Sequence, residues 1–530
     1  MTDRSKTHGP HEQGLLARLP QLRRRQFLAG AAALSALGAA GVPLRAGAAP
    51  SGHLRVVANA NPSSLDPATG GAGSDHVFLY CFYDTLVDWD FATLAPQPGL
   101  AESWEFTDPQ TLVFTLRQGV TFHDGTPFDA AAVAFNLQRN RTAELSNIKN
   151  DLANVETVEA TGEHEVTLKL SAPDTALPLI LSDRAGMMVS PAALGNDPEA
   201  KVDRAPVGTG PWTFTAWTDG DKVSGAANPD HWREGIPKVE SIELQIIPER
   251  ATALRAAQSG QADIAYQISE QQKVLIEKMP TLELAFGPTL YVYQLYLNAS
   301  RGPLSDPRIR KAITMAVDRE DWVKATQAGV GEPAWMNLPQ AHWAWSEEAA
   351  KYTQHDLDRA RALMKEAGVE GGFELDFRGY TDQASVQRSE VILQQLGKLN
   401  ITGRFTNGTI AETSSRFFSA EKAGDVLLSA WTGRPDPSLT YSLLYSESSY
   451  YNPGRVAPPE GFEAAMADSR ATADQAERAA ALGRAQALVM DAALTIPLSI
   501  RYEVDALSTK VQGYSANLLG KPKFLHVGLG

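Results

Sequence analysis

Cysteine is almost absent from this chain of 530 residues, in which Cys81 is the only one. A single cysteine excludes an intrachain disulfide and any zinc or iron–sulfur site built from several cysteines. The neighbours of Cys81 are apolar or aromatic: Phe78, Leu79, Tyr80 and Phe82. We therefore expect Cys81 to be a small buried residue of the core.

The short motifs that indicate catalysis or cofactor binding are also missing. There is no Gly-x-Ser-x-Gly elbow, no His-Glu-x-x-His pair, no Gly-x-x-x-x-Gly-Lys phosphate loop, and no Gly-x-Gly-x-x-Gly after a strand. After the first fifty residues, the histidines are scattered and none has metal-ligand spacing from another: His53, His76, His123, His164, His231, His342, His355 and His526. The sequence predicts no catalytic residue, no metal site and no cofactor.

Long hydrophobic runs are absent after the first fifty residues, which themselves have the pattern of an export signal. The basic segment 23–28 precedes an Ala/Gly/Leu-rich stretch at 29–42, and Ala46-Gly47-Ala48 offers small residues for cleavage. The arginine pair Arg24-Arg25 predicts a twin-arginine-type signal peptide over residues 1–48. The alternative is an uncleaved anchor, but the apolar run is short for a membrane span. We expect a mature protein that is soluble in the periplasm.

The charge balance is acidic. The formal net charge is −14, and residues 1–48 contribute seven Lys/Arg against two acids, so the rest of the chain carries −19. Such a surface repels phosphate backbones, which argues against nucleic acid as a partner. The hydrophobic fraction of 43% and the charged fraction of 21% are typical of a globular protein. The length indicates two to four domains.

Strands and helices are mixed along the chain. Three segments alternate apolar and polar residues and predict strands: 111–117, 165–170 and 242–247. Helices are predicted where a capping residue precedes an apolar pattern of helical spacing: from Asp306, from Asp318 to Gly329, from Asp356 to Gly368, and over 249–259 before a strand at 262–268. The Pro/Trp-rich stretch 331–345 predicts an irregular loop. The class is therefore α/β with a mixed sheet.

Several passages, in this order, resemble one family. They are Ser64-Leu65-Asp66-Pro67, Tyr83-Asp84-Thr85-Leu86-Val87, Leu100-Ala101-Glu102-Ser103-Trp104, the block from Phe114 to Phe128 that contains His123-Asp124-Gly125-Thr126, Val207-Gly208-Thr209-Gly210-Pro211-Trp212, and Pro303 to Ile313. This ordered set is similar to the family 5 extracellular solute-binding proteins, which are the peptide-, nickel- and opine-type binding components of ABC importers. The likeness covers nearly the whole mature chain. We assign most of these residues to the scaffold, with Gly125 in a tight turn and Gly208 and Gly210 at a bend.

The resemblance implies a two-lobed periplasmic-binding-protein fold with an additional subdomain inserted in lobe one and a ligand cleft between the lobes. We expect lobe one at 53–83, 201–290 and 511–530, the inserted subdomain at 84–200, and lobe two at 291–510. In this architecture, the lobes close over the ligand about hinge strands, and binding shifts that equilibrium. The implied partner is the permease of an ABC importer, and delivery to it requires only a monomer.

Cleft residues should come from loops at the ends of strands in both lobes. From lobe one, the candidates are Asn59 and Asn61, which could equally serve the turn before Pro62. Tyr291 and Tyr293 lie near the crossing into lobe two and can line the cleft or pack beneath it. Weaker candidates follow the strand 373–377: Arg378, Tyr380 and Asp382. Arg378 can equally form a surface salt bridge.

The best passage in lobe two is the loop Trp431-Thr432-Gly433-Arg434-Pro435-Asp436. Trp431 can stack on a ligand or pack in the core, and Gly433 allows close backbone approach. In peptide-binding relatives, this loop carries an aspartate that pairs with the α-amino group of the ligand, whereas Arg434 stands at the nearest position here. Its planar fork suits carboxylate or phosphate, so we expect an anionic group on the ligand. Asp436 can pair with an amino group, but we favour it as a helix cap.

The sequence thus predicts a binding protein rather than an enzyme. Its ligand is expected to be a small peptide or related amino-acid derivative, including opine-like or sugar-conjugated ones. Two alternatives stay open: a carrier of nickel or a metal chelate, and a secreted hydrolase that reuses the cleft. The metal content of the purified protein distinguishes a metal carrier from a peptide-binding protein. Turnover of a bound peptide distinguishes a hydrolase from a binding protein.

Overall fold

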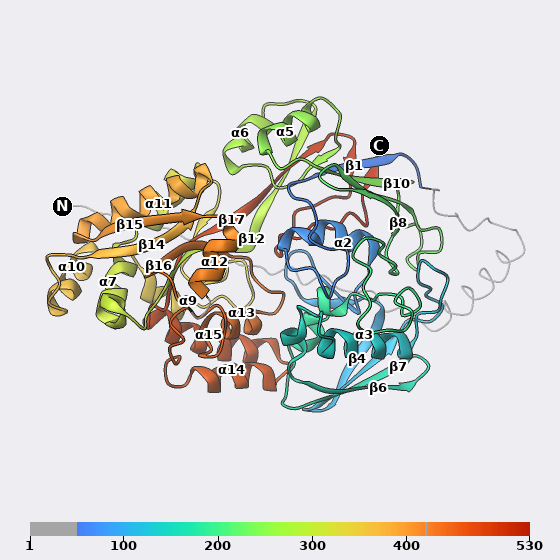
Figure 1. The fold of residues 1–530 in the computed structure, drawn as a ribbon, viewed down its shortest axis with the longest axis horizontal. Coiled ribbons are helices and arrows are strands. Elements are labelled where there is room, and N and C mark those ends of the chain that lie inside the picture. The colour runs from blue at the N-terminus through green and yellow to red at the C-terminus, as the bar shows by residue number, and fades with distance from the viewer. Residues whose placement is uncertain (1–49, 419–420) are drawn as a thin grey trace, which may run out of the picture. The chain divides into compact units, whose positions relative to one another are not determined.

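The structure is a computed structural model that describes residues 50–418 and 421–530. Helices and strands are interspersed along this part of the chain (Figure 1). The α/β class expected from the sequence is therefore confirmed. The predicted signal peptide at 1–48 lies outside the described residues.

The largest sheet has eleven strands and mixes parallel with antiparallel pairs. Its strands, in spatial order, are β15 (Thr402–Gly408), β14 (Glu374–Tyr380), β16 (Val426–Trp431), β12 (Leu282–Leu297), β17 (Thr495–Ser508), β11 (Ile264–Ala265), β1 (His53–Ala58), β10 (Ser241–Ile246), β9 (Lys222–Ala227) and β8 (Trp212–Thr218), with β13 (Glu332–Pro333) beside β17. β1 runs parallel to β10 and β11, and β14 runs parallel to β15 and β16. The expectation of a mixed sheet is confirmed.

β12 and β17 form the long antiparallel pair at the centre of this sheet (Figure 1). Residues 282–288 of β12 pair with 502–508 of β17, whereas residues 292–296 pair with 495–500. The first half lies next to β11, which pairs with Ala506 and Leu507, and the second half pairs with β16. The register shifts between Pro288 and Val292, where the ladder passes from one half to the other. These two strands therefore connect the β1 side of the sheet to the β14 side.

A separate four-stranded sheet lies wholly within the predicted inserted subdomain. Its order is β4 (Ala101–Asp108), β5 (Thr111–Leu116), β7 (Glu165–Leu170) and β6 (Val155–Gly162), all antiparallel. The alternating apolar residues predicted to share a face do so and are buried: Leu112, Phe114 and Leu116 on β5, with Val166, Leu168 and Leu170 on β7. The division into lobes at 84, 200, 290 and 510 stays a prediction.

The remaining elements are two small hairpins and the helices. The hairpins pair β2 (Val87–Trp89) with β3 (Pro96–Pro98), and β18 (Val511–Gln512) with β19 (Gly528–Leu529). The α-helices are α2 (His76–Phe82), α3 (Ala130–Thr142), α4 (Leu177–Ile180), α5 (Arg250–Gln258), α6 (Lys273–Ile276), α7 (Pro307–Ala316), α8 (Arg319–Gln327), α9 (Glu347–Ala350), α10 (Leu357–Glu366), α11 (Gln383–Leu396), α12 (Ile410–Phe418), α13 (Pro437–Tyr445), α14 (Phe462–Ala471) and α15 (Gln475–Asp491).

The predicted helix starts are confirmed by the hydrogen bonds at their caps. The carboxylates of Asp306, Asp318 and Asp356 accept from backbone N–H groups two or three residues further on, at 2.8–2.9 Å. Two other expectations need correction. The strand expected at 262–268 shrinks to Ile264–Ala265, because only these two residues pair with both β1 and β17. The loop 331–345 contains the short strand β13, which pairs with β17.

The family motifs prove to be scaffold. Gly125 has φ +80°, as the predicted tight turn requires, and the Thr126 hydroxyl donates to Asp124 at 2.6 Å. The bend expected at Gly208 and Gly210 is present over residues 209–211, and the two glycines also allow a close approach. A Cβ on Gly208 would lie 2.2 Å from the carbonyl oxygen of Phe82, and one on Gly210 would lie 2.4 Å from its carbonyl carbon. Only glycine allows the two segments to approach so closely.

The first motif of the family places a carboxylate in a buried ion pair. Arg139 donates to both oxygens of Asp66, at 3.1 and 2.7 Å, and both side chains are completely buried. The remaining capacity of Asp66 is used by the backbone N–H groups of Ala68 and Val202, at 3.0 and 3.1 Å. The pair ties the loop after β1 to α3.

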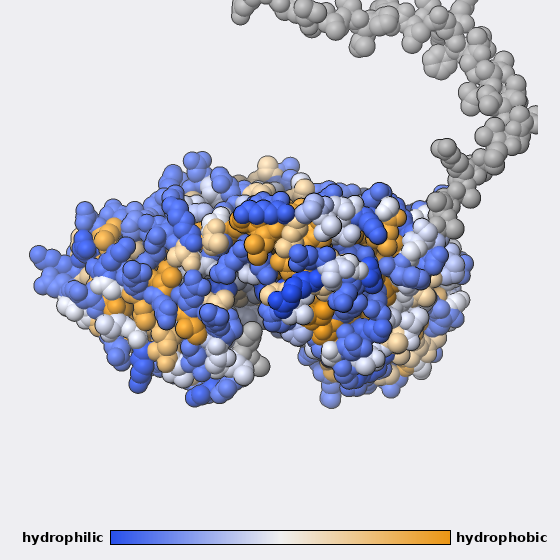
Figure 2. Space-filling model, turned by 90° about the horizontal axis from the view of Figure 1, so that it is seen from above, coloured by the Kyte–Doolittle hydropathy of each residue, from blue (hydrophilic) through white to orange (hydrophobic). Residues whose placement is uncertain are grey.

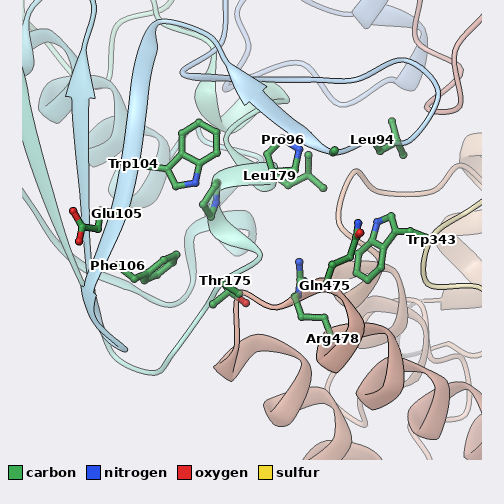
Figure 3. A pocket seen from close by; sticks show the side chains of 13 residues that line it. Leu94, Pro96, Trp104, Glu105, Phe106, Thr175, Leu179, Trp343, Gln475 and Arg478 are labelled. Atoms are coloured by element: carbon green, nitrogen blue, oxygen red, sulfur yellow. The ribbon is translucent and has the colours of Figure 1, made fainter. Parts of the chain in front are cut away.

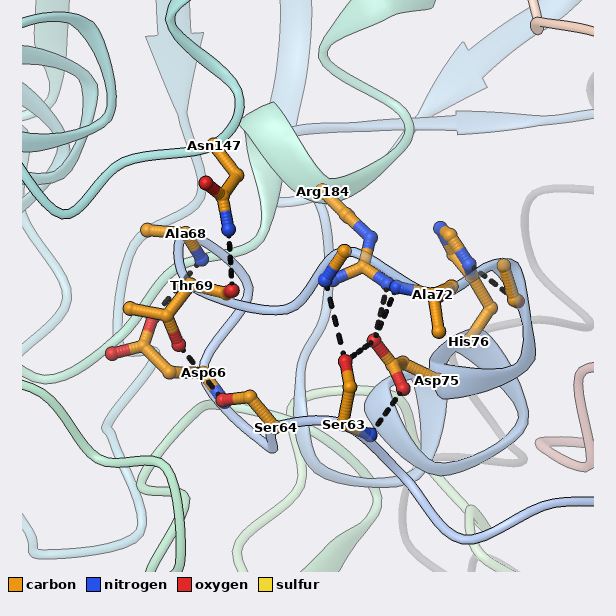
Figure 4. A network of polar contacts seen from close by, with 12 residues as sticks. Ser63, Ser64, Asp66, Ala68, Thr69, Ala72, Asp75, His76, Asn147 and Arg184 are labelled. Atoms are coloured by element: carbon orange, nitrogen blue, oxygen red, sulfur yellow. Dashed lines mark hydrogen bonds and ion pairs between the residues drawn. The ribbon is translucent and has the colours of Figure 1, made fainter. Parts of the chain in front are cut away.

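A second buried carboxylate fixes the same loop (Figure 4). Asp75 accepts hydrogen bonds from the backbone N–H and the hydroxyl of Ser63, both at 2.7 Å, and from Arg184 at 2.9 Å. The Ser63 hydroxyl in turn accepts from the N–H of Gly71 at 3.3 Å. This network holds the backbone of Gly71 in place, and Gly71 reaches the candidate site described below.

Apolar side chains are mainly confined to the cores. Hydrophilic residues cover most of the face in Figure 2, with apolar ones in patches between them. In the described part of the chain, five large hydrophobic residues are well exposed: Val274, Leu275, Phe286, Tyr352 and Tyr450. None of the helices at 50–418 and 421–530 has the length and hydrophobicity needed to cross a membrane.

Candidate ligand-binding site

A cavity of about 700 Å³ is bordered mainly by β12, β14, β16, α11 and α12. Residues between 291 and 451 supply almost all of its lining. The segments before them contribute Gly71, from the loop after β1, and Arg250, the first residue of α5. A cavity of this size suits a small organic solute.

Tyrosine dominates the lining of this cavity. Tyr291 and Tyr293 share one face of β12, since alternate residues of a strand point the same way, and their ring centroids are 5.9 Å apart. Burial, followed by the nearby Tyr293 hydroxyl, raises the pKa of Tyr291, so it stays a neutral hydrogen-bond donor. Tyr380, at the end of β14, lies 2.7 Å from the Ser429 hydroxyl. Tyr296, Tyr450 and Tyr451 complete the tyrosine lining.

Three arginines face the cavity, and none has a carboxylate at ion-pair distance among the described residues. Arg388 donates to the hydroxyls of Tyr293 and Ser385, both at 3.2 Å, and its Nε has no partner. Arg434 donates to the carbonyl oxygen of Gly433 at 2.7 Å and lies 4.7 Å from the centre of the Trp431 ring.

Arg250 is the third of these arginines. It is half-buried and forms no hydrogen bond with any residue that the structure describes. Burial, followed by the charge of Arg501, lowers its pKa. A guanidinium is a cation in proteins, so these three side chains bring positive charge to the lining.

Asp382 is the single acidic residue in the described part of the lining. One oxygen accepts from the backbone N–H of Ser385 at 3.0 Å and so caps α11. Burial opposes ionisation of Asp382, but the hydrogen bonds from Ser385 and the charge of Arg388 outweigh it, and its pKa is lowered. The cavity lining therefore has three cations and one anion.

Seven of the residues nominated from the sequence line this cavity together: Tyr291, Tyr293, Tyr380, Asp382, Trp431, Thr432 and Arg434. Trp431 is buried and packs edge-on against Tyr451, with ring centroids 5.2 Å apart, so it both lines the cavity and belongs to the core beneath it. Their function as ligand contacts stays a proposal.

The other five nominated residues do not line the cavity. Asn59 donates to Gln267 at 2.7 Å, and the side-chain oxygen of Asn61 accepts from the backbone N–H of Gly220 and from the Trp217 ring. Arg378 pairs with Asp376 at 2.8 Å, which is the salt-bridge alternative. A Cβ on Gly433 would lie 2.3 Å from the Cβ of Leu290, so its small size serves packing.

Asp436 is the fifth, and its surroundings are those of a helix cap. It is fully buried, accepts from the backbone N–H of Ser438 at 2.9 Å, and pairs with Arg478 at 2.7 Å. These partners use its charge inside the protein, so pairing with a ligand amino group gains no support from the structure.

Arg250 and Arg388 were missed from the sequence. Each lies in a helix that follows a strand of the main sheet: β10 leads to α5, and β14 leads to α11. Ligands of open α/β sheets bind beyond the carboxyl ends of strands. That rule, applied to arginines near the starts of such helices, would have nominated both.

A second cavity of about 450 Å³ lies between β4 and α15 (Figure 3). Its lining is mainly apolar and aromatic, including Trp104, Phe106 and Trp343, and no described residue lines both cavities. The one cation here, Arg478, is already paired with Asp436. The one acid of its described lining, Glu105, is solvent-exposed, so no unpaired cation here attracts an acidic solute, and the larger cavity is the candidate site. No group of three or more His, Cys, Asp or Glu within 50–418 and 421–530 is arranged to hold a metal ion.

Comparisons with known proteins define the class. The model of the "Bacterial extracellular solute-binding proteins, family 5 Middle" matches residues 95–452, so the chain belongs to this family of solute-binding proteins. The chain is 28% identical over 490 residues to the glutathione-binding protein GsiB of Salmonella paratyphi A, covering 87% of this chain and 91% of the relative.

Solved structures agree on the fold. The binding protein AgaA from A. tumefaciens R10, in complex with agropinic acid, is 23% identical, with a TM-score of 0.79, covering 90% of this chain and 99% of that one. DppA from Helicobacter pylori, in complex with the peptide STSA, is 24% identical, with a TM-score of 0.80, covering 91% and 98%. The predicted family and two-lobed periplasmic-binding-protein fold are confirmed. These relatives are named as binding proteins, not as enzymes.

Proposed function

We propose that this protein is the substrate-binding component of an ABC importer and captures a small, peptide-like solute with more acidic than basic groups. The observation that carries the choice of ligand is the set of three arginines, Arg250, Arg388 and Arg434, which face one cavity with no described carboxylate at ion-pair distance. A partly buried cation without a counter-charge is unfavourable, so the site favours a ligand that supplies one.

The physical chemistry of the lining supports an organic acid. A hydrogen bond to a charged group contributes about 1.5–3 kcal/mol, and a guanidinium can donate two such hydrogen bonds to one carboxylate. Tyrosine hydroxyls and rings give a peptide-like body both hydrogen bonds and apolar contact. Asp382 is available for one ammonium group. The best match is a solute with one ammonium and at least two anionic groups.

The relatives bind solutes of this type. GsiB is named as a glutathione-binding protein, and AgaA was solved with agropinic acid. Glutathione carries two carboxylates and one ammonium at neutral pH, which matches the charges of this lining. It is therefore the first ligand to test, and opine-like acids are the second.

The rest of the proposal concerns location and delivery. DppA is described as an ABC transporter-associated periplasmic binding protein. We infer export by the twin-arginine-type signal at 1–48, a monomer in the periplasm, closure of the two lobes over the solute, and transfer to the permease. Replacing Arg24 and Arg25 together by lysine should retain the precursor in the cytoplasm, seen by fractionation. Undiminished export would refute this route.

The ligand is tested by calorimetric titration and thermal shift with glutathione, its diethyl ester and trialanine. A ligand at 100 times its Kd adds about 2.7 kcal/mol to native stability. An unfolding entropy of about 2.1 cal/mol/K per residue over about 480 residues turns this into a rise in Tm of about 2–3 °C. We expect this rise with glutathione. We do not expect it with the diethyl ester, which has no free carboxylate, or with trialanine, which has only one.

Arg388→Gln and Arg434→Gln test the site itself. Each should weaken glutathione binding by about 10- to 100-fold, because one charge-assisted hydrogen bond is lost. Arg404→Gln is the control, since Arg404 lies on β15 with 68% of its side chain exposed and does not line the cavity. Equal affinity in all three variants would refute the site. Mass spectrometry of the bound solute should recover it unchanged, and a cleaved product would indicate a hydrolase instead.

A further inference from the structure

The two sides of the main sheet contribute very unequally to the candidate cavity. Among the described residues before 291, only Gly71 and Arg250 line it. Gly71 has no side chain, so Arg250 is the single side chain that this half of the described chain presents to the solute. The opposite lining, from β12, β14, β16 and the segments beside them, includes Arg388, Arg434 and Asp382.

The position of Arg250 is fixed by its helix. It is the first residue of α5, directly after the cap Glu249, whose carboxylate accepts from the N–H groups of Ala251 and Thr252 at 3.0 and 2.6 Å. The carboxylate of Glu249 is thus used by the backbone, and it makes an ion pair at 3.8 Å with Arg255, not with Arg250. The helix start therefore holds Arg250 at the cavity without neutralising it.

Burial and charges of both signs act on Arg250. Among these charges, that of Arg501 on β17 has the largest effect and lowers the pKa of Arg250, whereas Glu270 and Glu503 act in the opposite direction. Arg501 lies 3.6 Å from Glu270 and 3.7 Å from Glu503, and it faces the Tyr291 ring at 5.2 Å. Both acids therefore lie closest to Arg501. Their charges also act on Arg250, but no described carboxylate lies at ion-pair distance from Arg250, which faces the cavity.

We propose that Arg250 is the residue through which the β1 side of the sheet recognises an anionic group of the bound solute, and that closure of the protein depends on this contact. The inference rests on the proposed function. It narrows the ligand to molecules with two anionic groups, one held by the Arg388 and Arg434 side and the other by Arg250. A solute without the second group binds to the β14 side and leaves the protein open.

The reasoning is thermodynamic. A ligand shifts an open–closed equilibrium only by the difference between its affinities for the two states. Contacts on the β14 side are available in both states, so they add affinity without favouring closure. A contact from Arg250 exists only when the two sides approach, and it alone among the side chains makes the closed state favourable.

The experiment compares Arg250→Gln and Arg250→Lys with Arg255→Gln, a control on the same helix whose side chain is 68% exposed. Affinity for glutathione and for its diethyl ester is measured by calorimetry, and closure is followed as the decrease in radius of gyration by small-angle X-ray scattering. Circular dichroism melting checks that each variant is folded.

The expected result has three parts. Arg250→Gln binds glutathione about 10- to 100-fold more weakly and shows no decrease in radius of gyration at saturation. Arg250→Lys keeps the charge and recovers part of both effects, and Arg255→Gln behaves as the unmodified protein. Weak binding of the diethyl ester, which lacks both anionic groups, is the same with and without Arg250.

A folded Arg250→Gln that closes normally and binds glutathione within twofold of the unmodified protein would overturn the inference while leaving the proposed function intact. Equal losses for glutathione and the diethyl ester would also overturn it, because the residue would then act through packing. If the unmodified protein binds neither glutathione nor opine-like acids, the proposed function fails and the inference with it.

Discussion

Loss of one partner of the buried pair Asp66–Arg139 should destabilise the protein much more than loss of one partner of an exposed pair at the same distance. Both side chains are inaccessible to solvent, and their closest N–O distance is 2.7 Å. Asp66→Asn leaves the guanidinium of Arg139 charged and buried without a counter-ion. Removing one partner of such a pair typically destabilises a protein by about 3–5 kcal/mol.

The structure offers a matched control for this effect. Arg484 and Asp468 also lie 2.7 Å apart, but 55% and 64% of their side chains are exposed. An exposed pair contributes only about 0.2–1 kcal/mol. With an unfolding entropy of about 1 kcal/mol/K for about 480 residues, Asp66→Asn should lower Tm by about 3–5 °C and Asp468→Asn by less than about 1 °C.

The assay is differential scanning calorimetry of the mature protein and both variants in the same buffer. The double variant Asp66→Leu with Arg139→Met removes both charges and should recover most of the loss, because no uncompensated ion remains. If Asp66→Asn and Asp468→Asn lower Tm equally, burial does not set the strength of these pairs. If the double variant is as unstable as the single one, the uncompensated charge is not the cause.

Three further predictions concern other parts of the chain. Gly433→Ala should destabilise the protein by about 1–2 kcal/mol and weaken solute binding, since Gly433 has φ +72° and a Cβ would lie 2.3 Å from that of Leu290; an unchanged Tm would contradict this. Burial lowers the pKa of His342 to about 4, and its Nδ1 accepts from the N–H of Ala344. Between pH 6.5 and 4, the unfolded chain therefore binds a proton at His342 that the native protein does not bind. The free energy of unfolding should fall by up to about 3 kcal/mol as the pH drops through this range. His342→Asn should remove that part of the pH dependence of the free energy of unfolding, measured by urea denaturation at several pH values. The same pH dependence in the variant and the unmodified protein would refute this prediction. Cys81 is buried and burial raises the pKa of its thiol, so Ellman's reagent should react with it only after denaturation, and fast labelling of the native protein would disprove this.

Local patterns in the sequence were enough to place much of the fold. The caps at Asp306 and Asp356 lie where a carboxylate precedes an apolar helical pattern, and the structure shows their hydrogen bonds. The strand at 262–268 was overestimated because its length depends on which neighbours are available, and pairing stops after Ile264 and Ala265. Strand ends of this kind are set by tertiary contacts that no local pattern contains.

The candidate site divides in the same way. Tyr291 and Tyr293 were found because alternation on a strand puts both on one face, and Arg434 because its loop matched a family position. Arg388 lies among polar residues of α11, where any arginine satisfies a solvent-facing pattern. Its role follows only from the packing of α11 beside the cavity. Asp436 illustrates the opposite error, because a carboxylate in the right loop turned out to be committed to Arg478.

The central pair of β12 and β17 also has a consequence for how this chain reaches its native state. β12 ends at residue 297, but its partner begins only at residue 495, so roughly 200 residues must be synthesised before the ladder can close. Until then β12 and β11 present unpaired edges, and such edges recruit other chains. A chain that stops before 508 should therefore aggregate rather than fold into a smaller binding protein, and any factor that protects the nascent chain would be needed most during this interval.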